Sequence, residues 1–122
     1  IFLPEKQLKD AINKQIVTDA TALEDSKNPD SNTTCALIEL ITNKNHANTI
    51  REKLLQGGYG WGHAKKELLT VILERFANER QLYNQLMSDK EALNTILLEG
   101  AQKARVTANE TLKRVRKNLG YS

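Results

Sequence analysis

The chain has 122 residues, a formal net charge of +3 and a single cysteine, Cys35. This length is enough for one domain with its own core, and a composition with 39% hydrophobic and 27% charged residues is too apolar for a disordered chain. The lone cysteine excludes an internal disulfide and a zinc site of paired cysteines, and no apolar run approaches the roughly 20 residues of a membrane-spanning helix.

The N-terminal segment predicts a helix over residues 5–17 that begins after Pro4. A proline suits the first turn of a helix, because its missing N–H would find no partner there. Apolar residues recur every four positions and would share one face: Leu8, Ile12 and Ile16. Residues 18–32 are rich in Asp, Ser and Asn, and they predict an ordered but irregular loop in which Asp19 and Asp25 act as caps or hydrogen-bond acceptors.

A short helix is predicted next, starting at Asn32 or Thr33, either of which can cap it. Its body, residues 35–41, is apolar almost all round, which indicates burial on more than one side. Cys35 lies in this run, and we interpret it as a small core residue.

Two further helices are predicted on either side of a pair of glycines. A helix over residues 46–56 would end at Gly57-Gly58, because a left-handed cap favours glycine. The following helix, residues 62–87, would be the longest and would carry one apolar stripe. Ser88 and Glu91 then have the spacing of a capping box that starts the last helix.

The last predicted helix has the most regular apolar pattern. We call its apolar row the seam: Leu93, Leu97, Ala101, Ala104, Ala108, Leu112, Val115 and Leu119. Spacings of three and four are typical of a coiled coil, and the alanines would let a neighbouring helix approach closely. Gly100 would mark either a break or a close contact, and Gly120 would end the helix. The elements together predict an all-α fold, an antiparallel bundle of five or six helices.

Positive charge is concentrated at the C-terminal end. From Ala101 onwards, six Lys or Arg residues face one acid, Glu110, so this segment carries +5 and the remainder −2. Such a surface suits the phosphates of a nucleic acid, although a solvated helix face would explain the same charges. Lys103, Arg114 and Lys117 would share one face of the helix, away from the seam. Lys113 and Arg116 would flank that face, and Arg105 would point in a different direction from Lys103.

The segment GYGWGHAKK, residues 58–66, is a second candidate contact surface. Its glycines permit a tight turn into a helix whose first N–H groups could hold a phosphate. Trp61 offers a stacking surface for an unpaired base, and Lys65 and Lys66 add positive charge. The alternative is a structural turn whose aromatic rings cover the core, and for Trp61 the two interpretations weigh equally.

Four stretches of the chain, taken in order, carry a family resemblance: FLPEKQLKDAINKQIVTDAT with the KNPDSNTT loop, then GYGWGHAKK, EGAQKAR and ANETLKRVRKNLGY. In this order they resemble the C-terminal region of bacterial tryptophanyl-tRNA synthetases over essentially the whole chain. The sequence departs from the family in lacking the HIGH-like and KMSKS-like signatures. It also lacks the Ser that usually follows the Thr-Asp pair, here Thr18-Asp19, which concerns only the local loop geometry.

The resemblance implies a parent enzyme that activates L-tryptophan with ATP and Mg and transfers it to tRNA(Trp). In this family a Rossmann domain binds the small substrates and forms most of the dimer interface, and the helical C-terminal region recognises the anticodon arm. The start at Ile1 rather than at a methionine also suggests a fragment. Residues 1–32 would then follow the missing catalytic domain, and residues 33–122 would form the tRNA-binding region, both within one helical domain.

From the resemblance we expect this fragment to hold no cofactor, metal site or catalytic residue, and to be cytoplasmic without a membrane partner. Its expected partners are tRNA(Trp) and the catalytic domain of the same chain. The candidate tRNA contacts are Trp61, Lys65, Lys66, Lys103, Arg105, Lys113, Arg114 and Lys117. His46 and His63 lie on separate elements and lack a third ligand, so they do not support metal binding or catalysis.

The alternative is a helical protein-interaction or scaffold module without RNA binding. In that case the seam would hold a partner helix, and the chain would oligomerise in solution.

Overall fold

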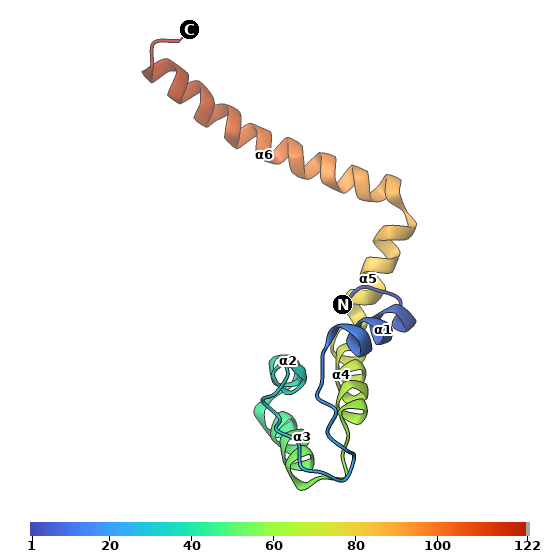
Figure 1. The fold of residues 1–122 in the computed structure, drawn as a ribbon. Coiled ribbons are helices and arrows are strands. Elements are labelled where there is room, and N and C mark those ends of the chain that lie inside the picture. The colour runs from blue at the N-terminus through green and yellow to red at the C-terminus, as the bar shows by residue number, and fades with distance from the viewer. Residues whose placement is uncertain (122) are drawn as a thin grey trace. The chain divides into compact units, whose positions relative to one another are not determined.

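The computed structural model describes residues 1–121, and in this range it contains six helices and no strand. The helices are α1 (Glu5–Gln15), α2 (Thr34–Ile41), α3 (Lys44–Gln56), α4 (Trp61–Arg75), α5 (Ala77–Ser88) and α6 (Lys90–Asn118) (Figure 1). The all-α prediction is therefore confirmed. The chain divides into two compact units, Ile1–Arg80 and Gln81–Ser122.

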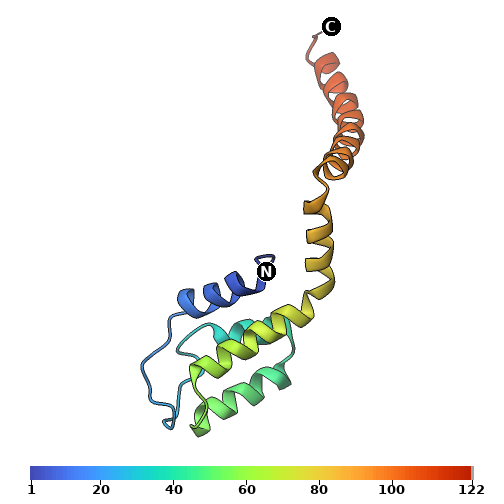
Figure 2. The same ribbon diagram turned by 90° about the vertical axis from the view of Figure 1, so that its right-hand side faces the viewer.

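In the first unit α4 is the central helix, because α1 and α2 both pack against it and α3 packs against α2 (Figure 2). The apolar face predicted for α1 is the one that is buried, at Leu8 and Ile12. Cys35 and Ile38 of α2 are fully buried and belong to the same core as Leu68 of α4. The prediction of Cys35 as a core residue is confirmed, and burial raises the pKa of its thiol.

The start of α2 and both ends of α3 follow local side-chain and glycine chemistry. The Asn32 side chain accepts the Thr34 N–H at 2.9 Å, whereas Thr33 makes no capping hydrogen bond. Helix α3 begins two residues before the predicted start, because Asn43 caps it by accepting the His46 N–H at 2.9 Å. Gly57 and Gly58 end α3 with φ angles of 82° and 72°, as predicted.

The prediction of one helix over residues 62–87 is wrong in its continuity, since α4 and α5 are separated at Phe76. The Phe76 N–H still donates to the Ile72 carbonyl at 3.1 Å, and its own carbonyl accepts the Arg80 N–H at 2.9 Å. No proline or glycine stands at this point. The Phe76 ring packs against the core, a tertiary contact that the spacing of apolar residues does not report.

The predicted capping box at Ser88 and Glu91 is also wrong. Ser88 is the last residue of α5, and its hydroxyl donates to the Gln85 carbonyl at 2.7 Å. The cap of α6 is Asp89, whose carboxylate accepts the Ala92 N–H at 2.9 Å. The capping residue, Asp89, therefore lies one position after the predicted one, Ser88.

Helix α6 runs through Gly100 without a break, and a Cβ added there would meet nothing within 4 Å, so neither prediction for this glycine holds in the described residues. Gly120 follows the helix with a φ of 79°, as predicted. No residue of α6 is buried, and the seam leucines Leu97 and Leu119 are 62% and 68% exposed. Within residues 1–121, no helix is both long and apolar enough to cross a membrane.

Candidate nucleic-acid interface

The loop between α1 and α2 is organised around a buried lysine. Lys27 is only 2% exposed, and its ammonium donates to three carbonyls of the same loop, those of Ala22 at 2.7 Å, Leu23 at 3.0 Å and Asp25 at 2.8 Å. An ammonium has three N–H donors, so each one is used. This is how a buried charge avoids the cost of losing its hydration.

The loop is fixed to the turn that leads into α4. The Lys27 N–H donates to the Leu54 carbonyl at 2.8 Å, and the Gly58 N–H donates to the Leu23 carbonyl at 3.0 Å. A Cβ at Gly57 would lie 2.3 Å from the Glu24 carbonyl oxygen, so the approach of the two backbones requires glycine here. The glycine-rich turn that opens the second candidate contact surface, residues 58–66, is thus part of a packed junction.

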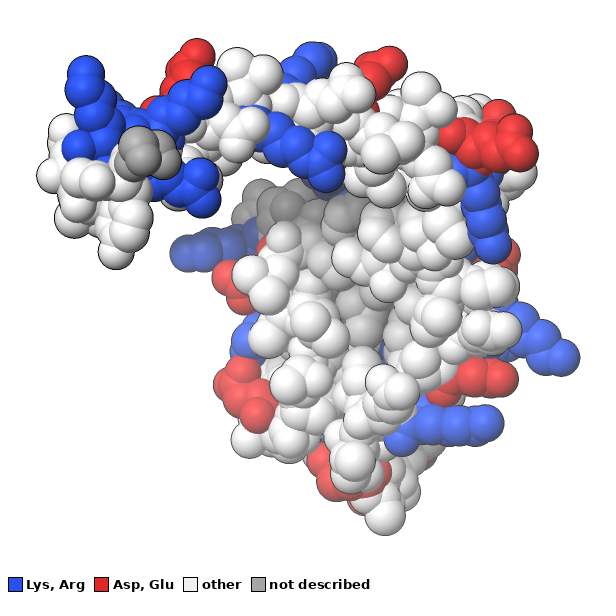
Figure 3. Space-filling model, turned by 90° about the horizontal axis from the view of Figure 1, so that it is seen from above, with Lys and Arg blue, Asp and Glu red and all other residues white. Residues whose placement is uncertain are grey.

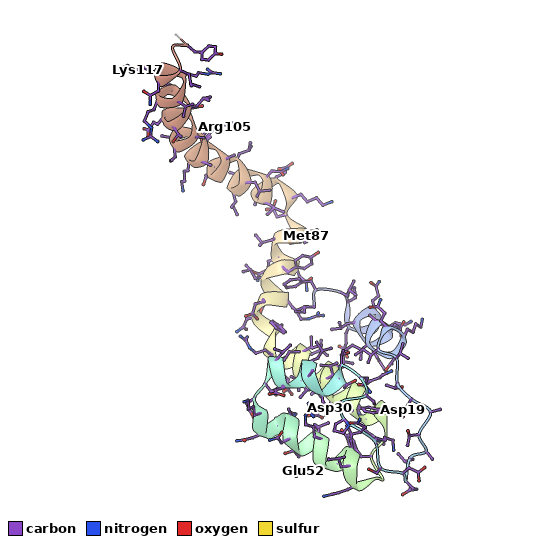
Figure 4. All side chains as sticks on the ribbon, turned by 60° about the vertical axis from the view of Figure 1, so that its left-hand side comes forward. Asp19, Asp30, Glu52, Met87, Arg105 and Lys117 are labelled. Carbon is purple, nitrogen blue, oxygen red and sulfur yellow. The ribbon has the colours of Figure 1, made fainter. Side chains whose placement is uncertain are left out.

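Trp61 belongs to this junction. It is 6% exposed, and its indole N–H donates to the Asp19 carboxylate at 2.9 Å. The same carboxylate accepts from the hydroxyl and N–H of Thr21 and from the Ser31 hydroxyl (Asp19 is labelled in Figure 4). These bonds, the Thr21 hydroxyl foremost, lower the pKa of Asp19 to about 2. The indole faces are packed in the core, which supports the structural alternative for Trp61 and confirms Asp19 as a loop acceptor.

Lys65 is also turned inward. It is 8% exposed, and its ammonium donates to the Asn13 carbonyl at 3.1 Å and the Ile16 carbonyl at 2.7 Å, at the C-terminal end of α1. Carbonyls at a helix C-terminus carry partial negative charge, so this contact holds α1 on α4. Lys66, the next residue, is exposed.

The other side chains of the glycine-rich turn contact one another. The Tyr59 and His63 rings stack at a centroid distance of 5.3 Å, and the Lys53 ammonium lies 5.7 Å from the centre of the Tyr59 ring. His46 Nε2 lies 2.9 Å from Glu67 Oε1. Among the described residues, no group of three His, Cys, Asp or Glu side chains could hold a metal ion.

The basic residues of α6 are placed differently. Because α6 is continuous, spacings of eleven and three put Lys103, Arg114 and Lys117 on one side of the helix. In the described part of the chain, none of the α6 cations forms an ion pair. Lys and Arg side chains gather near the C-terminal end of α6 (Figure 3), and Figure 4 labels Arg105 and Lys117 along it.

The chain was compared with known proteins, and no protein-family model matches it. The tryptophan–tRNA ligase of Fusobacterium nucleatum is 38% identical over 120 residues, which cover 98% of this chain and 36% of that protein. The ligase of Pseudomonas putida is also 38% identical over 120 residues, which are 26% of its length. The crystal structure of tryptophanyl-tRNA synthetase from Campylobacter jejuni matches with a TM-score of 0.87 at 34% identity, over 98% of this chain and 38% of that one.

The chain is homologous to bacterial tryptophanyl-tRNA ligases. The resemblance inferred from the sequence is therefore confirmed. The chain spans about a third of the F. nucleatum and C. jejuni proteins and about a quarter of the P. putida protein. A second C. jejuni tryptophanyl-tRNA synthetase structure, described as a complex with ADP and tryptophan, matches with the same TM-score of 0.87.

Proposed function

We propose that this chain is the tRNA-binding part of a tryptophanyl-tRNA synthetase, whose parent enzyme joins L-tryptophan to tRNA(Trp) with ATP. The observation that carries the proposal is the homology, which extends over 98% of the chain. The exposed cations of α6 support it, because they are free to pair with phosphate groups. We further propose that the parent is a cytoplasmic homodimer that is joined through its catalytic domain.

ATP and Mg are assigned to the part of the parent that this chain does not span. The described residues form only helices, so they do not fit the nucleotide: they cannot build the Rossmann sheet expected to bind it. The C. jejuni complex with ADP and tryptophan supports nucleotide binding by the parent. In this proposal the chain alone does not charge tRNA, and an aminoacylation assay of the isolated chain would measure this directly.

The proposed contacts are the exposed candidates alone: Lys66, Lys103, Arg105, Lys113, Arg114 and Lys117. Trp61 and Lys65 are assigned a different part, because both are buried and hydrogen-bonded inside the first unit. They position the start of α4 and the end of α1. Contacts to phosphates give affinity and salt dependence, whereas recognition of particular bases needs contacts to base edges.

A comparison of two charge-matched variants tests the role of α6. One variant replaces Lys103, Arg114 and Lys117 by Gln, and the control replaces three exposed lysines of the first unit, Lys6, Lys14 and Lys44. In fluorescence titrations with labelled tRNA(Trp) at low salt, we expect the α6 variant to bind at least tenfold more weakly than the control. Equal affinities of the two variants would show that net charge, and not α6, determines binding.

The second candidate function, a protein-interaction module, is favoured by the exposure of the seam. Leu112 and Val115 are each 44% exposed, and with Leu119 they line a hollow on α6. If the seam joins two copies of this chain, Leu112→Glu will convert a dimer into a monomer in sedimentation velocity. A wild-type chain that sediments as a monomer would contradict self-association through the seam.

A further inference from the structure

A groove between α1 and α4 contains Lys66, one of the proposed contacts, but the groove itself has no part in the proposed function. It encloses about 490 Å³, and Lys9 of α1 and Lys66 of α4 lie on its walls. Gly62, in the first turn of α4, also lines it, and a Cβ at this position would meet nothing within 4 Å. The groove is lined by residues of the first unit, whereas the cations of α6 belong to the second unit.

The charge of the groove is the first reason to expect an anion. Its lining contains three cations, Lys9, Lys65 and Lys66, against one acid, Glu5. None of these four side chains takes part in an ion pair among the described residues. The groove therefore presents uncompensated positive charge on partly apolar walls, where a charge interacts more strongly than at an open surface.

The second reason is the incomplete pairing of Lys65. Lys65 is 8% exposed and has no carboxylate partner, and its ammonium makes two hydrogen bonds, to the Asn13 and Ile16 carbonyls. Lys27, which is 2% exposed, uses its three donors on three carbonyls. One N–H of Lys65 is thus left without an acceptor in the described residues, although a buried donor gains most from having one.

The start of α4 adds a third donor to the same wall. The first N–H groups of a helix have no partner within the helix. No hydrogen bond from the Gly62 N–H is formed by the described residues, and the missing side chain leaves this backbone open to the groove. A phosphate that accepts from Lys65, Lys66 and a backbone N–H matches this set of donors.

We propose that the α1–α4 groove binds a backbone phosphate of tRNA, with Lys9 and Lys66 on its rim and Lys65 at its wall. This inference rests on the proposed function and extends it to a second contact surface, separate from α6. In this assignment the Lys65 ammonium both holds α1 on α4 and contributes a donor to the anion site.

Two variants test the groove without disturbing Lys65. Lys9→Gln with Lys66→Gln removes the rim charges, and Lys6→Gln with Lys14→Gln is a control of equal charge on α1 outside the groove. Gly62→Leu fills the groove, and it has free space for its Cβ. We expect both groove variants to bind tRNA(Trp) about tenfold more weakly than the control at low salt, the effect of losing one charge-assisted contact.

A competition experiment with inorganic phosphate distinguishes a groove that binds a tRNA phosphate from one that binds a free anion. At constant ionic strength, added phosphate should compete with tRNA for binding to the wild-type chain. In the Gly62→Leu variant, added phosphate should no longer weaken tRNA binding. If phosphate binds the wild-type groove but the groove variants keep full affinity for tRNA, the assignment of the groove to RNA is overturned. Wild-type binding of tRNA that is unchanged in both groove variants would reject the groove alone, whereas a wild-type chain that binds no tRNA would reject the proposed function itself.

Discussion

Asp19 links the loop to the core through one exposed carboxylate. Its folded-state pKa of about 2 lies below the ordinary value of 3.8, so its contribution to stability is complete above the ordinary pKa and is lost as the pH falls towards the folded pKa. We expect the urea midpoint of the wild-type chain to fall between pH 5 and about pH 2, and Asp19→Asn to show a smaller fall. Asp25→Asn in the same loop is the control, because the Asp25 carboxylate accepts no hydrogen bond from the described residues. Identical pH profiles for the wild type and Asp19→Asn would contradict this role.

The junction requires glycine at position 57. Alanine there would adopt a φ of 82° and place its Cβ 2.3 Å from the Glu24 carbonyl oxygen. We expect Gly57→Ala to lower the free energy of unfolding by roughly 2 kcal/mol, since the left-handed conformation alone costs about 1 kcal/mol. Gly62→Ala is the matched control in the same unit, and helix propensity predicts a gain of up to about 1 kcal/mol. Denaturation by urea measures both, and a neutral Gly57→Ala would show that the loop yields easily.

Single residues differ in how well their burial and hydrogen-bond partners could be predicted from the sequence. Cys35 was predicted correctly, because an apolar neighbourhood is a reliable sign of burial. Asp19 was expected to be a local acceptor, and its partner Trp61 could not be foreseen across forty-two positions. The buried lysines Lys27 and Lys65 had no sequence signal, because only the folded backbone brings carbonyls to an ammonium. Lysine normally indicates the surface, and Lys65 was accordingly chosen as an RNA contact.

At the level of elements, the start of α6 depends on Asp89. Replacement of a side chain that caps a helix typically costs about 1 kcal/mol. We expect Asp89→Ala to speed hydrogen exchange of the Ala92 amide and of its neighbours in the first turn. Ser88→Ala should leave this exchange nearly unchanged, because the Ser88 hydroxyl bonds backward to Gln85. Faster exchange in Ser88→Ala than in Asp89→Ala would restore the capping box that the sequence suggested.

The helices could be predicted from the sequence where the spacing of apolar residues and the position of glycines indicate the same boundaries. The face of α1 and the stop at Gly57 follow from local rules and were predicted. For α2 we expected burial on more than one side, but Leu40 is 81% exposed. The interruption at Phe76 was missed, because the stripe of α4 continues into α5 and no helix-breaking residue marks the change. For α6 the periodicity identified the helix correctly, but periodicity alone does not tell whether a partner covers the seam.

At the level of the whole molecule, the chain spans only part of its relatives, which are about three to four times as long. Among the described residues, no residue of the α6 seam is buried. The order of motifs made the family recognisable from the sequence, whereas the division between exposed and buried cations needed the structure. The division matters most for function, because it removes Trp61 from the proposed contacts, leaves Lys65 only as a donor inside the α1–α4 groove and retains the exposed cations of α6.

The salt dependence of tRNA binding tests the central claim most directly. Each phosphate contact releases counterions, so the logarithm of the association constant should fall linearly with the logarithm of salt concentration. For the variant with Lys103, Arg114 and Lys117 replaced by Gln, we predict a slope shallower than that of the wild type by roughly 2 to 3, from roughly 0.7–0.9 for each of three lost contacts. The control with Lys6, Lys14 and Lys44 replaced should keep the wild-type slope. A wild-type chain without salt-dependent binding, or an α6 variant with an unchanged slope, would contradict the account.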